Sequence, residues 1–261
     1  MSTTKSDRPQ SDTPPTLNAE PPARAENRAE QPVGVDRSLL RLGATAGLVG
    51  VAVQVIMDRL HPHRIDPNDS PGVFREYAGS QDWTWVHIGQ FAGTLMIIFG
   101  LIALARSLSR QAGMAGALGV VGAVAGVLVA AVFTVQMAVD GVALKAAIDA
   151  WMGAAPADHS SAFQVAESVR WTEKGLSGFF QMVQGVTLVA LGLSIALGGR
   201  FPRWLGVVGA LAGAMIIAGG TVTAHTGFSS TAGLILTPGT VLLAVFAIGT
   251  FIVMWRRDGH K

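Results

Sequence analysis

Residues 204–255 decide the fold; they read WLGVVGALAGAMIIAGGTVTAHTGFSSTAGLILTPGTVLLAVFAIGTFIVMW and contain no Asp, Glu, Lys or Arg. About 20 apolar residues in a helix cross the ~30 Å hydrocarbon core of a bilayer, so this stretch is long enough for two spans. Polar residues on either side of Gly227 separate them. No strand-like alternation is present, and backbone amides in lipid must be bonded internally, so both spans are predicted to be helices.

Four more apolar stretches precede this one, and together they predict a polytopic membrane protein. Half of the 261 residues are hydrophobic and only 14% are charged, which leaves too few polar side chains for the water-facing sides of a soluble helical domain. We therefore predict an all-α bundle of six transmembrane helices over residues 38–255, built of three consecutive helical hairpins. Short amphipathic helices are expected in the first two outer connections. The predicted spans are about 39–59, 86–105, 113–139, 175–199, 204–226 and 232–255.

The two ends of the chain are predicted to be tails. Residues 1–37 are polar and rich in proline, so they cannot bury enough apolar surface to offset the entropy lost on ordering, and they are predicted to be disordered. Residues 256–261 form a short C-terminal tail. The net charge of +2, without a basic patch, argues against nucleic acid as a partner, and the absence of cysteine excludes disulfides and thiolate chemistry.

The distribution of basic residues predicts the orientation. Of the 19 Lys and Arg, 13 lie in the two tails and in the connections on the same side of the membrane as the tails, and six lie on the opposite side. Because cytoplasmic loops carry the excess of positive charge, both termini are predicted to be cytoplasmic. The expected location is a bacterial plasma membrane, and the lipid bilayer is the expected partner.

An internal repeat supports the hairpin organisation. Residues 118–126 (LGVVGAVAG) recur as residues 205–213 (LGVVGALAG), with eight of nine positions identical. Glycine pairs at four-residue spacing let helix backbones approach closely and favour a compact bundle; the same small-residue faces offer a route to oligomers. The pairs are Gly43/Gly47, Gly89/Gly93, Gly122/Gly126 and Gly209/Gly213.

Polar residues gather in the predicted outer halves of the helices. They are Gln54, Asp58, His87, Gln90, Gln136, Asp140, Glu173, Gln181, Gln184 and His225. Because such groups are costly in lipid, they favour an outward-facing polar pocket that binds a small ligand, an ion or a lipid headgroup. Two alternatives stay open: the glutamines join helices by hydrogen bonds, and Glu167, Arg170 and Glu173 form surface ion pairs on an amphipathic helix.

A metal site is a second hypothesis. His61, His63 and His87 lie on the predicted outer side near several carboxylates, and histidine with carboxylate suits zinc or another divalent metal. The alternative is that His61 and His63 are solvated loop residues. No other cofactor is predicted, and no residue is assigned a catalytic role.

Three functions therefore remain. The sequence favours a binding protein without covalent chemistry, ahead of a membrane-embedded metal-dependent enzyme and of a structural or assembly protein.

Several short motifs carry a family resemblance. They are His61-Pro62-His63, Val86-His87-Ile88-Gly89-Gln90, Arg170-Trp171-Thr172-Glu173 and Pro202-Arg203-Trp204-Leu205-Gly206. Over residues 38–255 the chain resembles uncharacterised six-helix membrane proteins of bacteria, especially actinobacteria. The resemblance implies the six-helix fold and carries no activity that transfers to a residue of this chain.

Overall fold

The structure is a computed structural model that describes residues 33–62 and 64–256. The predicted disordered tail (residues 1–37) lies almost entirely outside the described residues, as do His63 and most of the predicted C-terminal tail. Within the described range the chain is helical throughout and contains no strand, which confirms the all-α prediction.

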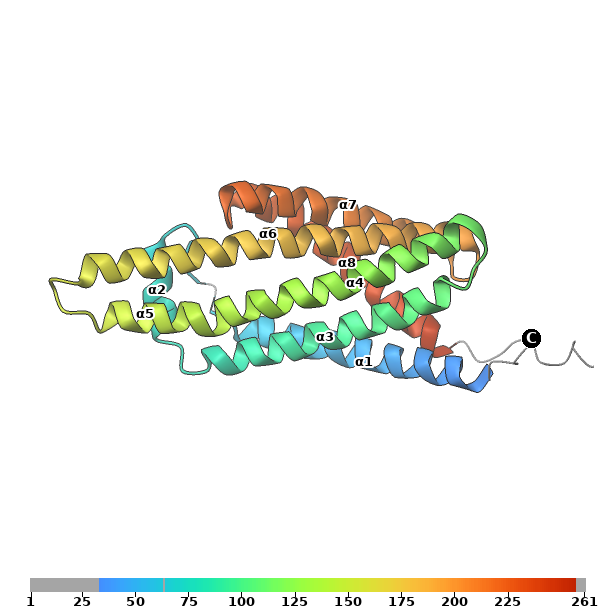
Figure 1. Cartoon of the computed structure of the whole chain (residues 1–261), viewed down its shortest axis with the longest axis horizontal. Coiled ribbons are helices and arrows are strands. Elements are labelled where there is room, and N and C mark those ends of the chain that lie inside the picture. Colours follow the sequence, from blue (N-terminus) through green and yellow to red (C-terminus); the bar gives the residue numbers. More distant parts are fainter. Residues whose placement is uncertain (1–32, 63, 257–261) are drawn as a thin grey trace, which may run out of the picture. The chain divides into compact units, whose positions relative to one another are not determined.

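The helices follow one another along the chain with short connections (Figure 1). They are α1 (Val33–Leu60), α2 (Ser70–Ala78), α3 (Trp83–Leu108), α4 (Gly113–Ala138), the π-helix η1 (Val139–Leu144), α5 (Lys145–Met152), α6 (His159–Gly198), α7 (Arg203–Thr226) and α8 (Ser230–Arg256). Six stretches among the described residues are long and apolar enough to cross a membrane, which indicates a multi-pass membrane protein. The six-helix bundle predicted from the sequence is thus confirmed.

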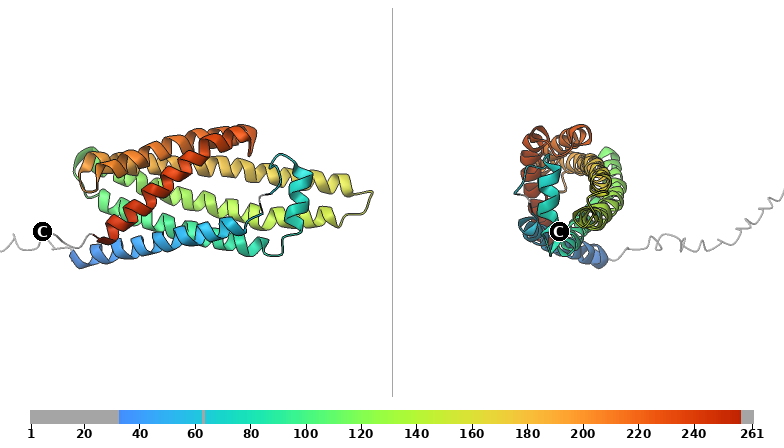
Figure 2. Two further views of the ribbon diagram at one scale, coloured as in Figure 1. Left: turned by 180° about the vertical axis from the view of Figure 1, so that it is seen from behind. Right: turned by 90° about the vertical axis from the view of Figure 1, so that its left-hand side faces the viewer.

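The order of the helices in space is seen in two views. Helix α6 lies between α4 and α7 (Figure 1). Helix α8 crosses the bundle diagonally, from the side of α7 to the start of α1 (Figure 2). Near its start Leu236 of α8 packs on Gly219 of α7, and near its end Phe251 packs on Gly47 of α1 and Gly100 of α3.

A seam of glycines joins α6 to α7 at every seventh residue. The facing pairs are Gly178 with Gly220, Gly185 with Gly213, and Gly192 with Gly206. A Cβ atom added at Gly185 would lie 2.5 Å from the backbone oxygen of Gly213, so the backbones touch where no side chain fits. Close backbone approach strengthens van der Waals packing, which holds helices together in lipid where the hydrophobic effect does not.

The connections on one side build a second, smaller core, which we call the cap. It contains α2, η1, α5 and the first turns of α6, and its buried side chains include Phe74, Trp83, Ile148 and Trp151. Helix α6 has 40 residues and is therefore about 60 Å long, roughly twice the thickness of the hydrocarbon core. The cap therefore extends beyond the depth that the helices need to cross a bilayer.

The two expected connection helices take different forms. Helix α2 is the short helix of the first connection; the Asp69 carboxylate accepts from the backbone N–H of Gly72 and caps its N-terminus. In the second connection the expected helical segment is continuous with the following span, so that both form the single helix α6. Only residues 153–158 separate α5 from α6.

The glycine seam gives a testable prediction. We expect Gly185→Ala to lower the melting temperature of the detergent-purified protein, because overpacking costs about 1–3 kcal/mol. Gly175→Ala on the same helix is the matched control, because nothing lies within 4 Å of its added Cβ. The control should be neutral or more stable, since alanine favours a helix over glycine by up to about 1 kcal/mol. Equal melting temperatures for the two variants would contradict the seam.

Candidate functional site

A histidine–aspartate pair lies where α3 meets the cap. The His87 Nε2 atom lies 3.3 Å from the Asp140 Oδ2 atom, and both residues are buried. The His87 Nδ1 atom lies 2.7 Å from the backbone oxygen of Trp83, so this nitrogen carries the proton and donates when the ring is neutral. The indole of Trp83 in turn donates to the backbone oxygen of Asp140 at 3.2 Å. The Trp83 bond fixes the backbone of Asp140 against the start of α3, and it places the carboxylate beside the His87 ring.

The π-helix η1 positions this pair. Its wider turn interrupts the α-helical register at Val139–Leu144, and Asp140 stands near its start. Gly141 allows α3 to approach, since a Cβ atom there would lie 2.6 Å from the Cβ of His87. Single π-helical turns inside α-helices are frequent at functional sites. The local irregularity therefore marks the same place as the buried carboxylate.

Arg170 and Glu173 of α6 form a buried ion pair beside the cap. The Arg170 guanidinium donates to the Glu173 carboxylate at 2.5 Å, and each side chain is only 4% exposed. The guanidinium also lies over the rings of Tyr77 and Phe228, at 5.4 and 5.0 Å from their centres. The expected surface ion pair is thus wrong in its placement. Removing one partner of a buried pair costs about 3–5 kcal/mol, so this pair fixes the first turns of α6 against α2.

Two more aromatic side chains, those of His61 and Tyr77, lie near the His87 ring and the Arg170 guanidinium. The His61 ring lies 5.2 Å from the His87 ring and 5.9 Å from the Tyr77 ring, measured between centres. Burial, and after it the nearby His87, lowers the pKa of His61. Burial also raises the pKa of Tyr77 to about 12, although Arg170 opposes the shift. Both side chains are therefore uncharged near neutral pH.

These groups surround a cavity of about 520 Å³, which we call the vestibule. Its wall includes Asp58, His61, Tyr77, Glu76, Gln90, Gln136, Asp140, Arg170, Glu173, Ser177 and Phe228. Most of these side chains are polar and come from α1, α2, α3, α4, η1 and α6. The vestibule thus lies between the cap and the bundle of spans.

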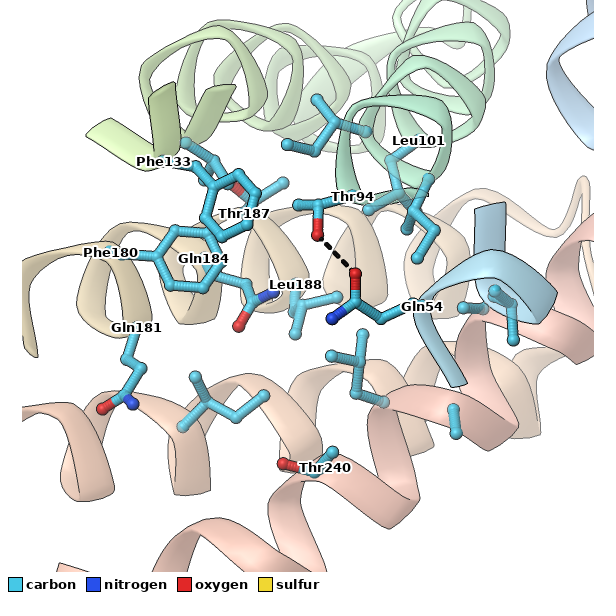
Figure 3. Close-up of a pocket in the computed structure, with 18 of the residues that line it drawn as sticks. Gln54, Thr94, Leu101, Phe133, Phe180, Gln181, Gln184, Thr187, Leu188 and Thr240 are labelled. Atoms are coloured by element: carbon cyan, nitrogen blue, oxygen red, sulfur yellow. Dashed lines mark hydrogen bonds between the residues drawn. The ribbon is translucent and has the colours of Figure 1, made fainter. Parts of the chain in front are cut away.

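A second cavity of about 360 Å³, the chamber, lies in the middle of the bundle. Its wall is mainly apolar, with side chains such as Leu101, Phe133 and Leu188, and a few polar groups point into it (Figure 3). The Thr94 hydroxyl donates to the Gln54 Oε1 atom at 3.0 Å there. Vestibule and chamber adjoin, because both are lined by Asp58, Phe180 and Gln181.

Buried acceptors around the vestibule are left unpaired. The Gln136 amide donates through Nε2 to the Ser177 hydroxyl at 2.8 Å, but its Oε1 atom has no hydrogen-bond partner among the described residues. Within the same part of the chain, the Oδ1 atom of Asp140 and the Oε1 atom of Gln181 also lack one. Nearly all buried polar atoms in folded proteins are paired with protein groups or with ordered water, so these acceptors are free to bind a donor in the cavity, whether water or a ligand.

The structure brings most of the predicted pocket residues together. Eight line the vestibule or the chamber: Gln54, Asp58, Gln90, Gln136, Asp140, Glu173, Gln181 and Gln184. His87 stands behind Asp140 in the wall. His225 does not join them, because its exposed ring bonds the backbone oxygen of Thr221 and lines neither cavity. Ligand binding by these residues stays a prediction.

The glutamines also serve the alternative role that the sequence left open. The amides of Gln54 and Gln90 both donate to Asp58 Oδ1, at 2.8 and 2.9 Å. The second of these bonds joins α1 to α3. Helix joining and cavity lining are thus combined in the same side chains.

The predicted metal site is not seen as a three-residue cluster in the described part of the chain. Among the residues that the structure describes, no three His, Asp or Glu side chains are placed to hold a metal ion. His63 lies outside the described residues, and the rings of His61 and His87 meet edge to face. Metal binding therefore stays a prediction.

Sequence reasoning missed part of the vestibule wall. Tyr77 and Phe228 were not singled out, and Arg170 was expected at the surface. A signal was available on α6, where Arg170, Glu173, Ser177, Gln181 and Gln184 recur at spacings of three and four residues. That spacing places them on one face of a helix, which lines the vestibule and the adjoining chamber.

No family model matches this chain, and neither curated proteins nor solved structures show a significant match to it. The resemblance drawn from the sequence stays a prediction, and the function must be argued from the cavities themselves.

Proposed function

We propose that the chain is a plasma-membrane protein that binds a small amphipathic molecule, with the polar part in the vestibule and the apolar part in the chamber. The observation that carries the proposal is a polar cavity with unpaired buried acceptors adjoining an apolar cavity of similar size. Small-molecule sites commonly have volumes of about 300–1,000 Å³ with a few polar groups that fix the orientation. Both cavities lie in this range.

The polarity of the walls supports an elongated, two-part ligand. Toward the cap the wall carries charged and amide side chains such as Asp140, Arg170 and Gln136. Toward the middle of the bundle it is formed by Leu, Ile, Val and Phe side chains. A purely polar ligand would leave the chamber unused, and a purely apolar one would leave the acceptors of the vestibule unpaired.

Two observations support an outward-facing vestibule. The start of α1 and the end of α8 lie at the end of the bundle that is opposite to the cap (Figure 1 and Figure 2). The positive-inside rule applied to the sequence puts this end in the cytoplasm. At the end of the bundle opposite to the cap, Arg110 and Arg200 lie in the connections, and Arg106 and Arg203 lie in the adjoining helix ends. The proposed ligand then enters from outside the cell or from the outer leaflet.

Cysteine labelling in intact cells tests the orientation, because the native chain has no cysteine. Asp149 lies on α5 in the cap and its side chain is 52% exposed, so Asp149→Cys should react with a membrane-impermeant maleimide added outside the cells. Met114→Cys, at an exposed position at the opposite end of the bundle, is the control and should react only after the membrane is permeabilised. The reverse pattern would overturn the proposed orientation.

A cavity-filling substitution tests the binding proposal. Ala244 lines the chamber, whereas its neighbour Val245 is exposed and lines neither cavity. We expect decylamine, decanol or decanoate to raise the melting temperature of the purified wild type and of Val245→Phe. Ligand at about 100 times its Kd adds about 2.7 kcal/mol, which corresponds to roughly 5–10 °C. Ala244→Phe should lose this shift.

Two results would count against the proposal. One is that none of the three compounds stabilises the wild type. The other is that both phenylalanine variants respond as the wild type does, which would mean that the amphiphiles act through the detergent micelle rather than the chamber.

A further inference from the structure

The charges that line the vestibule are unbalanced. Four carboxylates line it, from Asp58, Glu76, Asp140 and Glu173, against the single guanidinium of Arg170. That guanidinium is already bound to Glu173. His61, the one histidine that the described part of the wall contains, has a pKa below its usual value because it is buried, so it adds no positive charge near neutral pH. The cavity therefore favours a cation.

The buried atoms that lack a hydrogen-bond partner also favour a cationic ligand. All three that line the vestibule are acceptors: the Oε1 atoms of Gln136 and Gln181 and the Oδ1 atom of Asp140. Gln136 is 9% exposed and Asp140 8%, so both are buried. A carboxylate or a fully ionised phosphate has no proton to offer these atoms. An ammonium group has three donors and no acceptor.

The other two carboxylates, those of Asp58 and Glu76, accept hydrogen bonds from uncharged groups. Among the described residues, Asp58 accepts from the neutral amides of Gln54 and Gln90, and Glu76 accepts from the backbone N–H of Arg64 at 3.1 Å. These bonds orient the carboxylates without neutralising them. Phe180, at the boundary with the chamber, adds an aromatic ring near which a cation is favoured.

We propose that the polar end of the ligand is a protonated amine, held by Asp140 Oδ1 as counter-ion and by Gln136 Oε1 one turn away on the same helical segment. The inference rests on the proposed function and narrows it to cationic amphiphiles, that is, alkylamines and amines with a larger apolar body. The alkyl part extends past Gln181 and Phe180 into the chamber. The Nε2 atom of His87 lies 3.3 Å from the other carboxylate oxygen of Asp140, Oδ2.

The experiment compares three ligands that share one alkyl chain. Equilibrium binding of decylamine, decanol and decanoate to the full-length protein in nanodiscs is measured at neutral pH, where decylamine is protonated. We expect decylamine to bind at least about tenfold more tightly than decanol, as a charge-assisted bond worth roughly 1.5–3 kcal/mol predicts. Decanoate should bind most weakly.

Substitutions then locate the preference. Asp140→Asn keeps the shape of the side chain and should abolish the preference for decylamine while decanol still binds. Asp149→Asn is the matched control: it removes an exposed carboxylate of the same cap that is paired with Lys145, and the preference should stay. Gln136→Glu adds a carboxylate beside the proposed ammonium and should increase the ratio of decylamine to decanol affinity. If Asp140→Asn does not fold, the affinity ratio of Gln136→Glu tests the cation proposal by itself.

The outcomes separate the two proposals. If decanol or decanoate binds as tightly as decylamine, the cation proposal is overturned and the binding function stands. The same holds if Asp140→Asn keeps the preference or if Gln136→Glu lowers it. If none of the three compounds binds, both proposals fail.

Discussion

The constraint on which this structure depends is that a polar group in a lipid-embedded bundle must find its partner inside the protein. The backbone meets it by forming continuous helices, and the glycine seam between α6 and α7 brings two of them into direct contact. Polar side chains such as those of Thr187 and Thr221 satisfy this constraint locally, because their hydroxyls donate to a backbone oxygen in the preceding turn of the same helix. The unpaired acceptors around the vestibule are exceptions to this pattern, and they carry the functional argument.

The cap explains how a charged cavity is held together at the end of an apolar bundle. Aromatic side chains of α2, α3 and α5 form a core of their own, and the Arg170–Glu173 pair is buried between that core and α6. The π-helical turn η1 carries Asp140, whose Oδ2 atom lies 3.3 Å from His87 Nε2 and whose Oδ1 atom has no hydrogen-bond partner among the described residues. Rigid surroundings of this kind reduce the entropy that a ligand must lose to bind.

The apolar spans and the gathering of polar residues toward one end followed directly from hydropathy and from residue position. The continuous helix α6 did not, because hydropathy marks where a helix enters lipid and gives no sign that it continues into a cap. The surface ion pair was expected because residues 157–174 were predicted to form a short amphipathic helix on the outer surface; the packing of α2 and Phe228 shows that Arg170 and Glu173 are buried. Spacing alone also does not fix which face of α7 meets the bundle, so it gave no sign that the His225 ring is exposed. The π-helix has no marker in the sequence except Gly141 beside Asp140.

The central claim is that the junction of vestibule and chamber is reached by water and solute from outside the cell. The most direct test is the reactivity of Gln181→Cys with a charged, membrane-impermeant methanethiosulfonate reagent in intact cells. Val186→Cys on the same helix, exposed on the outside of the bundle, is the comparison. The account predicts that Gln181→Cys reacts and that decylamine protects it, while Val186→Cys stays unmodified in lipid because a thiol there does not ionise. An unreactive Gln181→Cys in a protein correctly inserted in the membrane would contradict it.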